Sequence, residues 1–256
     1  MFDTALTSRP LKLGLALSAA LLAACQGIRP APADPQLVQA WQGQILNMLQ
    51  RDMLAASGGS MVGAINLNIT LDRLGRPIAC STQRAKHSFA QAISPDALLT
   101  DRKVLARAVE AQCWRSVYPL PPDALFEGDT LEVVAPLILM KPPYVSENEQ
   151  ARRQAAARQA FFWTALMREE PVASIGLAEI RYQTNPTGKV TGCLVTLNPH
   201  PLRRDAFRLD GELQARLTQR CNGLDLQQLP GFAPSTPGGL EGYTRVEYAP
   251  WKVGRN

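Results

Sequence analysis

The feature that most constrains this chain is an internal repeat of a strand, a turn and a cysteine. The stretch LDRLGRPIACSTQ contains Gly75 and Cys80, and the later stretch TNPTGKVTGCLVT contains Gly188 and Cys193. The two glycines are 113 positions apart, and so are the two cysteines. A glycine between two runs of alternating apolar residues is typical of a β-hairpin. The repeat therefore predicts two hairpins of the same design.

The segments around the first hairpin have clear periods. Apolar residues four positions apart predict a helix that begins at Asp34-Pro35 and ends at Gly58-Gly59. The alternation in AINLNITL predicts the strand that enters the hairpin. After the hairpin, Asp101 can cap a second helix, and LEVVAPLIL at 131–139 reads as a strand. Because Pro136 has no N–H to donate, this strand should lie at a sheet edge or carry a bulge.

The second half repeats the same order. A helix that stops before Pro171 precedes the alternating strand around Ile180, the hairpin at NPTG, a helix that Asp210 can cap, and a closing strand at 242–248. Each half thus reads helix, strand, strand, helix, strand. We predict an α+β fold of two tandem modules, residues 36–141 and 146–252, each a small three-stranded antiparallel sheet packed by helices.

The N-terminus has the pattern of an export signal. The twelve apolar residues of LGLALSAALLAA follow a basic stretch and are too few for a membrane span, which needs about 20. The sequence LAAC that ends at Cys25 resembles the lipobox of bacterial lipoproteins. That resemblance implies removal of residues 1–24, a covalent lipid on Cys25 and a short tether over 25–35, and Gln26 favours the outer membrane. The alternative is an ordinary signal peptide with a chance cysteine.

The remaining cysteines predict two disulfides, because exported chains with four cysteines usually pair them. Three pairings of Cys80, Cys113, Cys193 and Cys221 are possible. The repeat favours Cys80 with Cys113 and Cys193 with Cys221, since each pair then joins the second strand of a module to the helix packed over it. A metal site is disfavoured because there is no CxxC pair.

Composition argues against several other functions. Without residues 1–24 the chain keeps a net charge of only +4, and its basic clusters at 102–107 and 203–208 are expected to be solvated, so we predict no nucleic-acid partner. There is no G-x-S-x-G, H-E-x-x-H or glycine-rich phosphate loop. His87 and His200 are expected to be exposed turn residues. We predict no enzyme activity, no metal, no small-molecule substrate and no cofactor besides the lipid.

The chain also resembles a known family. The order of elements, with LDRLGRPIAC at the turn, LARAVEAQCW on the helix and YPLPP after it, resembles the C-terminal periplasmic domains of TonB and TolA. The second half is similar to cysteine-containing relatives of that family through GKVTGC, and the likeness spans most of residues 36–140 and 146–250. It implies a protein-binding module without an active site, which takes an extended segment of a partner along an exposed sheet edge.

TonB and TolA are held by an inner-membrane helix and a long spacer, and this chain shows neither. Residues 26–34 can span at most roughly 30 Å, so we expect the modules to lie close to the membrane that holds the lipid.

The closing strand is the better docking edge, because it alternates without a proline whereas 131–139 contains Pro136. The predicted edge consists of Tyr243, Thr244, Arg245, Val246, Glu247 and Tyr248. The alternative is a solvated edge strand or pairing with the other half. We therefore predict an outer-membrane-anchored, periplasm-facing lipoprotein that acts as a protein-binding or scaffold subunit of an envelope transport, secretion or conjugation assembly. A periplasmic enzyme and a peptidoglycan-associated structural lipoprotein are the alternatives.

Overall fold

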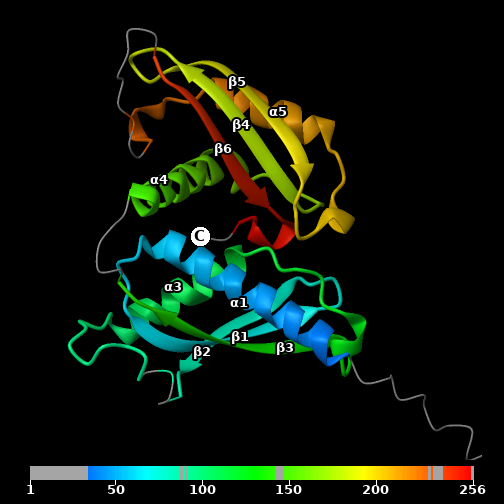
Figure 1. Cartoon of the computed structure of the whole chain (residues 1–256). Coiled ribbons are helices and arrows are strands. Elements are labelled where there is room, and N and C mark those ends of the chain that lie inside the picture. Colours follow the sequence, from blue (N-terminus) through cyan, green and yellow to red (C-terminus); the bar gives the residue numbers. More distant parts are fainter. Residues whose placement is uncertain are drawn as a thin grey trace, which may run out of the picture. The chain divides into compact units, whose positions relative to one another are not determined.

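The computed structural model describes residues 34–86, 89, 91–141, 147–229, 232 and 239–254. The predicted signal peptide, Cys25 and His87 lie outside the described residues. Within them the α+β fold of two tandem modules is as predicted (Figure 1). The first module consists of α1 (Pro35–Ser57), β1 (Gly63–Asp72), β2 (Pro77–Arg84), α3 (Arg102–Arg115) and β3 (Thr130–Leu139). The second consists of α4 (Glu147–Phe162), β4 (Gly176–Thr184), β5 (Val190–Pro199), α5 (Gly211–Asn222) and β6 (Glu241–Tyr248).

Short helical turns complete the chain between these elements. A π-helical turn, Trp163–Met167, continues α4, and 3-10 turns lie at Asp123–Leu125, Arg204–Ala206, Leu226–Gln228 and Pro250–Lys252.

The helices begin at the aspartates expected to cap them. At the start of α1, the Asp34 side chain accepts a hydrogen bond from Gln36 N. At the start of α3, the Asp101 side chain accepts hydrogen bonds from Lys103 N and Val104 N. At the start of α5, the Asp210 side chain accepts one from Leu213 N. Each bond satisfies a backbone N–H that has no partner inside the helix. At the other end of α1, Gly58 has the left-handed conformation that commonly ends a helix.

Each sheet has its first strand in the middle, so the strand orders are β2-β1-β3 and β5-β4-β6, antiparallel throughout. Both hairpins shift register at equivalent places, between Thr70 and Leu71 and between Gln183 and Thr184. The strand that contains Pro136 is an edge strand and pairs with β1 in a continuous register, with Pro136 opposite Asn66. The expectation of an edge position is therefore confirmed.

The hairpin turns are built alike. Gly75 and Gly188 have φ angles of +66° and +87°, a backbone conformation that glycine adopts without steric cost. The Asp72 side chain accepts hydrogen bonds from Leu74 N and Arg76 N, and the Asn185 side chain accepts them from Thr187 N and Lys189 N. In both turns, the side chain of an Asp or Asn three positions before the glycine therefore accepts backbone hydrogen bonds of the turn. This role was not predicted from the sequence.

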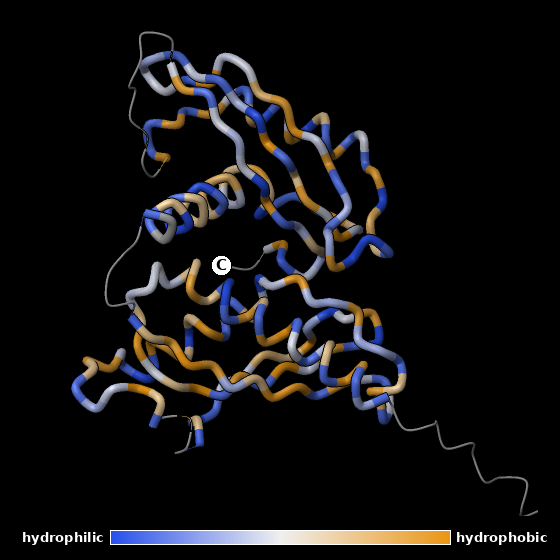
Figure 2. Tube along the Cα trace, in the orientation of Figure 1, coloured by the Kyte–Doolittle hydropathy of each residue, from blue (hydrophilic) through white to orange (hydrophobic). Residues whose placement is uncertain are grey.

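Each module has its own hydrophobic core on one face of its sheet. Along β1, the buried residues Ile65, Leu67, Ile69 and Leu71 alternate with partly exposed ones, and Figure 2 shows hydrophobic positions recurring along the strands. They pack with α1, α3 and β3, while a separate cluster joins β4, β5 and β6 to α5 and the end of α4. Because both helices of a module contribute to one cluster, both cover the same face of its sheet.

Two disulfides fasten these cores, and they are the pairs favoured by the repeat. Cys80 is bonded to Cys113 and Cys193 to Cys221, at sequence separations of 33 and 28. Closing loops of this length contributes about 3.5 kcal/mol each through the unfolded state in the chain-entropy view. Each bond joins the second strand of a sheet to the helix over it, as expected.

Candidate functional site

The two sheets have four edge strands that could accept a further strand. In the described residues, three of them carry a feature that opposes this at one or more positions. The edge of β5 is closed by α5. The backbone N–H groups of Cys193, Val195 and Leu197 donate to side chains of Asn222, Thr218 and Gln214, at 2.9, 3.2 and 3.2 Å. Because these acceptors lie four positions apart, they form a row along the helix that matches alternate residues of the strand.

The edges of the first module are closed differently. On β2, the Glu110 side chain accepts hydrogen bonds from Thr82 N at 2.9 Å and from Thr82 Oγ1 at 2.8 Å. Thr82 and Glu110 are the counterparts of Val195 and Thr218 in the repeat. On β3, Pro136 has no N–H to offer to another strand.

The direction of the backbone groups on β6 follows from the pairing on β5. Since Cys193, Val195 and Leu197 point their N–H groups away from β4, the residues between them bond to the odd-numbered residues of β4. The even-numbered residues of β4 therefore bond to β6, because antiparallel neighbours alternate. Ile180 and Ala178 lie opposite Thr244 and Val246.

It follows that Tyr243, Arg245 and Glu247 direct their backbone N–H and C=O groups outward from the sheet. Among the described residues, no hydrogen bond joins these groups to another element. The equivalent of Arg245 in the first module is Pro136, since Glu179 pairs with Arg245 where Asn66 pairs with Pro136. The edge of β6 is thus open at the place where the edge of β3 is blocked.

The side chains of β6 alternate as predicted. Thr244, Val246 and Tyr248 are buried, while Tyr243 and Arg245 are exposed. The guanidinium carbons of Arg181 and Arg245 lie 5.9 and 5.4 Å from the centroid of the Tyr243 ring, and the Tyr243 hydroxyl is hydrogen-bonded to Arg245. Arg245 Nε also lies 2.9 Å from Glu179 Oε1. The open edge therefore carries the Tyr243 ring and the cation of Arg245, and Arg181 of the neighbouring β4 lies beside them.

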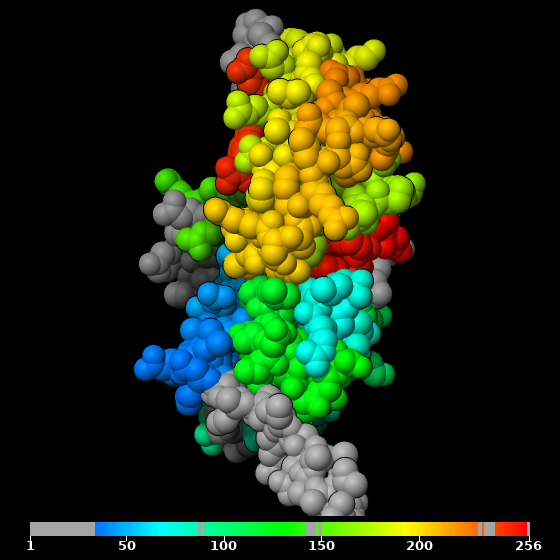
Figure 3. All heavy atoms as spheres, turned by 90° about the vertical axis from the view of Figure 1, so that its right-hand side faces the viewer, coloured from blue at the N-terminus to red at the C-terminus, as the bar shows by residue number. Residues whose placement is uncertain are grey.

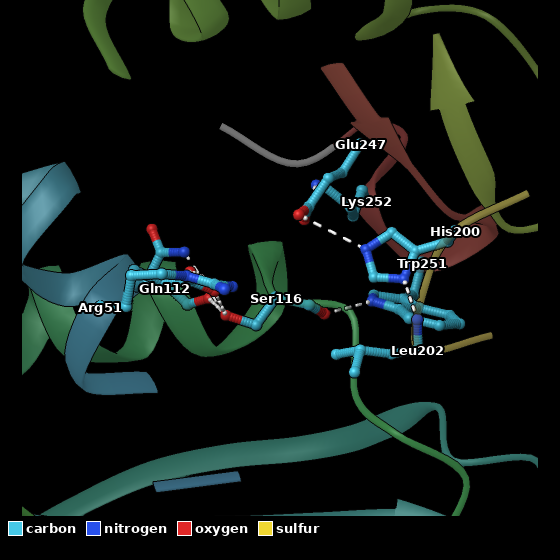
Figure 4. Close-up of polar contacts among 9 residues, drawn as sticks. Arg51, Gln112, Ser116, His200, Leu202, Glu247, Trp251 and Lys252 are labelled. Atoms are coloured by element: carbon cyan, nitrogen blue, oxygen red, sulfur yellow. Dashed lines mark hydrogen bonds and ion pairs between the residues drawn. The ribbon is translucent and has the colours of Figure 1, made fainter. Parts of the chain in front are cut away.

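Beyond Arg245, the strand reaches the contact between the two modules. Trp251, which follows β6, packs with Val117 and Ile175 and donates its indole N–H to Ser116 O at 3.2 Å (Figure 4). Ser116 in turn donates its hydroxyl to Asp52 Oδ2 at 3.2 Å. This contact joins the end of the second module to α1 and the end of α3.

The basic cluster at 203–208 corrects one prediction, because Arg203 is not solvated. It is 2% exposed, and its guanidinium donates to Leu74 O, at the hairpin turn of the first module, at 2.8 Å. Figure 3 shows the segment that follows β5, in gold, lying against the first module. Asp205 lies 3.1 Å away and balances the charge. Arg204 and Arg208 are exposed, as expected.

His200 corrects a second prediction, because it is 4% exposed and not a solvated turn residue. Its Nδ1 accepts a hydrogen bond from Leu202 N at 3.2 Å, and its Nε2 lies 3.4 Å from Glu247 Oε1 (Figure 4). An accepting Nδ1 leaves the proton on Nε2, directed at the carboxylate. His200 thereby orients Glu247 at the inner end of the predicted edge.

The charged groups at this end of β6 change one another's pKa values. Burial alone would raise the pKa of Glu247, but the hydrogen bond from His200 and the charge of Lys252 outweigh burial and lower the pKa to about 2. Burial lowers the pKa of Lys252, which is 9% exposed, against the opposing effects of Glu247 and Asp52. The pKa of Asp52 is raised by burial and by the charge of Glu247.

Comparisons with known proteins identify no relative. No family model matches the chain, and neither a curated protein nor a solved structure matches it significantly. The resemblance to TonB and TolA therefore stays a prediction from the sequence. In the part of the chain that the structure describes, no helix is long and apolar enough to cross a membrane, and no group of His, Cys, Asp and Glu is placed to hold a metal ion.

Proposed function

We propose that this chain is a lipid-anchored protein-binding subunit of a cell-envelope assembly, which takes an extended segment of its partner as a strand along β6. The observation that carries the proposal is the contrast between the edges. The edges of β5 and β2 are bonded to helix side chains and that of β3 contains a proline, whereas β6 directs the backbone groups of Tyr243, Arg245 and Glu247 outward.

An unpaired edge has a physical cost that an added strand removes. Open edges are a template for pairing with any extended chain, so natural proteins usually block them. Among the described residues the other edges are bonded or interrupted at one or more positions and β6 is not, which supports a use for that edge in binding. The Tyr243 ring, which is in contact with the guanidinium groups of Arg181 and Arg245, offers a contact for side chains of the added strand.

The anchor and the compartment belong to the same proposal. They are supported by the lipobox-like LAAC that ends at Cys25 and by two disulfides, which form in oxidising compartments such as the periplasm. On this proposal the subunit acts at the periplasmic face of the outer membrane. Replacing Cys25 with alanine should release the chain from the membrane fraction, and retention there would contradict the anchor.

The docking proposal can be tested with a change that the first module already contains. Arg245→Pro removes one outward N–H and copies the blocked edge of β3, while the bonds from Thr244 and Val246 to β4 remain. Arg245→Ala is the matched control, because it loses the same side-chain contacts with Glu179 and Tyr243 but keeps the N–H. Both variants would carry a photo-crosslinking amino acid at Tyr243 and be expressed in the native host.

We expect a defined crosslinked product with the alanine variant and with the protein that has only the crosslinker, and its loss with the proline variant. Thermal unfolding of the purified variants checks that both are folded. If the proline variant gives the same product as the alanine variant, backbone pairing along β6 is not how the partner binds.

A further inference from the structure

A cavity of about 540 Å³ lies between the two modules, at the inner end of the β6 edge. Val246 and Glu247 of β6 form part of its lining, together with residues from the end of α1, from α3, from α4 and from the C-terminal turn. The cavity is therefore not separate from the proposed docking edge. It adjoins the last of the three residues that direct their backbone outward.

A strand paired with β6 would lead into this cavity. Between Tyr243 and Glu247 a strand advances about 13 Å, at roughly 3.3 Å per residue. A partner segment bonded to Tyr243 and Arg245 thus needs only two further residues to come level with Glu247. Alternate side chains of an added strand point to opposite faces of the sheet, so one of them would face α4, which also lines the cavity.

The walls of the cavity leave room for such a side chain. At the end of α1 they include Ala55, Ala56 and the capping residue Gly58, and on α4 they include Ala156 and Ala160. Small side chains on two facing helices keep the space open. The Trp163 ring also lines the cavity, and Lys252 Nζ lies 5.2 Å from the centroid of this ring. This cation–π contact holds the lysine ammonium group in place.

The carboxylates that line the cavity have partners, whereas one of its cations has none among the described residues. Both carboxylates that line it already have partners: Asp52 accepts from Ser116 and Arg51, and Glu247 is held by His200 and Lys252. Arg115, the last residue of α3, also lines the cavity. Its side chain takes part in no hydrogen bond or ion pair with the residues that the structure describes, so the guanidinium donors are available.

We propose that this cavity is a specificity site of the docking edge, and that it binds a carboxylate side chain, Asp or Glu, of the extended segment paired with β6. A guanidinium matches a carboxylate with two parallel hydrogen bonds, and no carboxylate among the described residues provides them to Arg115. The inference rests on the proposed function, because the segment reaches the cavity by pairing with β6. It adds that recognition requires both modules, since Arg115 belongs to the first and β6 to the second.

The experiment uses the mature chain and a library of randomised nine-residue peptides displayed on phage. Selections are run in parallel on the wild type and on Arg115→Glu. A matched control is Arg107→Glu, which reverses an exposed charge on the same helix outside the cavity lining. We expect peptides enriched on the wild type and on Arg107→Glu to share an Asp or Glu at one position of an alternating pattern.

On Arg115→Glu that position should lose its acidic preference, and an acidic peptide made synthetically should bind about tenfold more weakly or worse. The inference is overturned if the acidic preference is absent on the wild type or unchanged on Arg115→Glu. Binding to Arg245→Pro separates the two proposals. If the selected peptides bind that variant as well as they bind Arg245→Ala, docking along β6 is wrong; if they lose affinity for it but ignore Arg115, only the cavity inference fails.

Discussion

Glu247 shows how a single side chain links the two modules. It lies at the end of β6, where its carboxylate is paired with His200, which follows β5, and with Lys252 of the C-terminal turn. The charge of Arg51 on α1 lowers the pKa of Glu247, and the charge of Glu247 raises the pKa of Asp52 on the same helix. These interactions keep its carboxylate ionised although much of it is removed from water. The ionised form therefore contributes to the stability of the folded chain.

This contribution should depend on pH with a definite sign. The pKa of Glu247 falls from 4.5 to about 2 on folding, so its stabilisation is fully present above pH 4.5 and is lost as the pH falls toward 2. The free energy of unfolding of the wild type should exceed that of Glu247→Gln at pH 6, and the difference should vanish near pH 2. Urea unfolding of both proteins from pH 6 to pH 2 measures it. A difference that stays constant over this range would show that the charge of Glu247 is not involved.

The residues of this contact also show where sequence reasoning stops. Gly75 and Gly188 could be placed because a hairpin turn is a local structure, set by a few neighbouring residues. Arg203 and His200 could not, because each is buried by contacts that the local pattern does not contain. Arg203 donates to Leu74, 129 positions away, and neighbouring arginines and prolines give no sign of such a contact.

At the scale of elements, α5 stabilises its sheet in two ways. Leu213, Leu217 and Cys221 fill the core, and the next position along the helix in each case, Gln214, Thr218 and Asn222, bonds to the edge of β5. One helix thus covers a face of the sheet and closes an edge. The spacing of four between the buried residues Leu213, Leu217 and Cys221 was visible in the sequence. The polar residues that follow each of them have the pattern of an ordinary solvated helix face, so their bonds to β5 could not be predicted.

The edge bonds should be measurable one at a time. Thr218→Val keeps the shape of the side chain but removes the acceptor of Val195 N, so it should lower the free energy of unfolding by about 1 kcal/mol. Thr196→Val is the matched control, since Thr196 is exposed on β5 and a β-branched apolar residue suits a strand. Urea unfolding at neutral pH compares them. Equal stability of the two variants would mean that the Thr218 bond contributes nothing.

The order of the helices and strands could be predicted from the sequence. Of the features that oppose a further strand at the sheet edges, only Pro136 could be predicted. Strand and helix periods, caps and the repeat itself gave helix, strand, strand, helix, strand twice, and Pro136 marked β3 as an edge. The roles of Glu110 and Thr218 were not predictable, because they depend on how far each helix lies from the second strand of its hairpin. That distance is set by packing in the core and has no local signal.

Across the whole molecule, the two modules share one fold and differ at their edges. Both use a turn glycine, an Asp or Asn that holds the turn, and a disulfide between strand and helix. At equivalent positions the third strand has a proline in the first module and Arg245 in the second. The first module contributes Arg115 and the end of α1 to the cavity instead. Within the described residues, the two modules thus differ in what opposes a further strand at their edges, and β6 is the edge with no such feature.

Such a division requires the modules to hold together, and Trp251 is the largest apolar side chain in the contact. It is 8% exposed and joins the cluster of Val117, Ile175 and Ala249, separate from the two cores. Trp251→Ala should remove about 3 kcal/mol or more from this contact and leave both cores intact. We expect one unfolding transition of the wild type in calorimetry and two transitions of Trp251→Ala.

The control is Tyr243→Ala, which removes an aromatic ring from the exposed face of the second sheet and should leave a single transition. The same variants locate the docking site, because the edge of β6 is retained in Trp251→Ala while the cavity loses its fixed shape. Peptides that pair with the edge should still bind that variant, but their preference for Asp or Glu should weaken. A single transition in Trp251→Ala, shifted to lower temperature, would show that the modules form one cooperative unit through contacts other than this side chain.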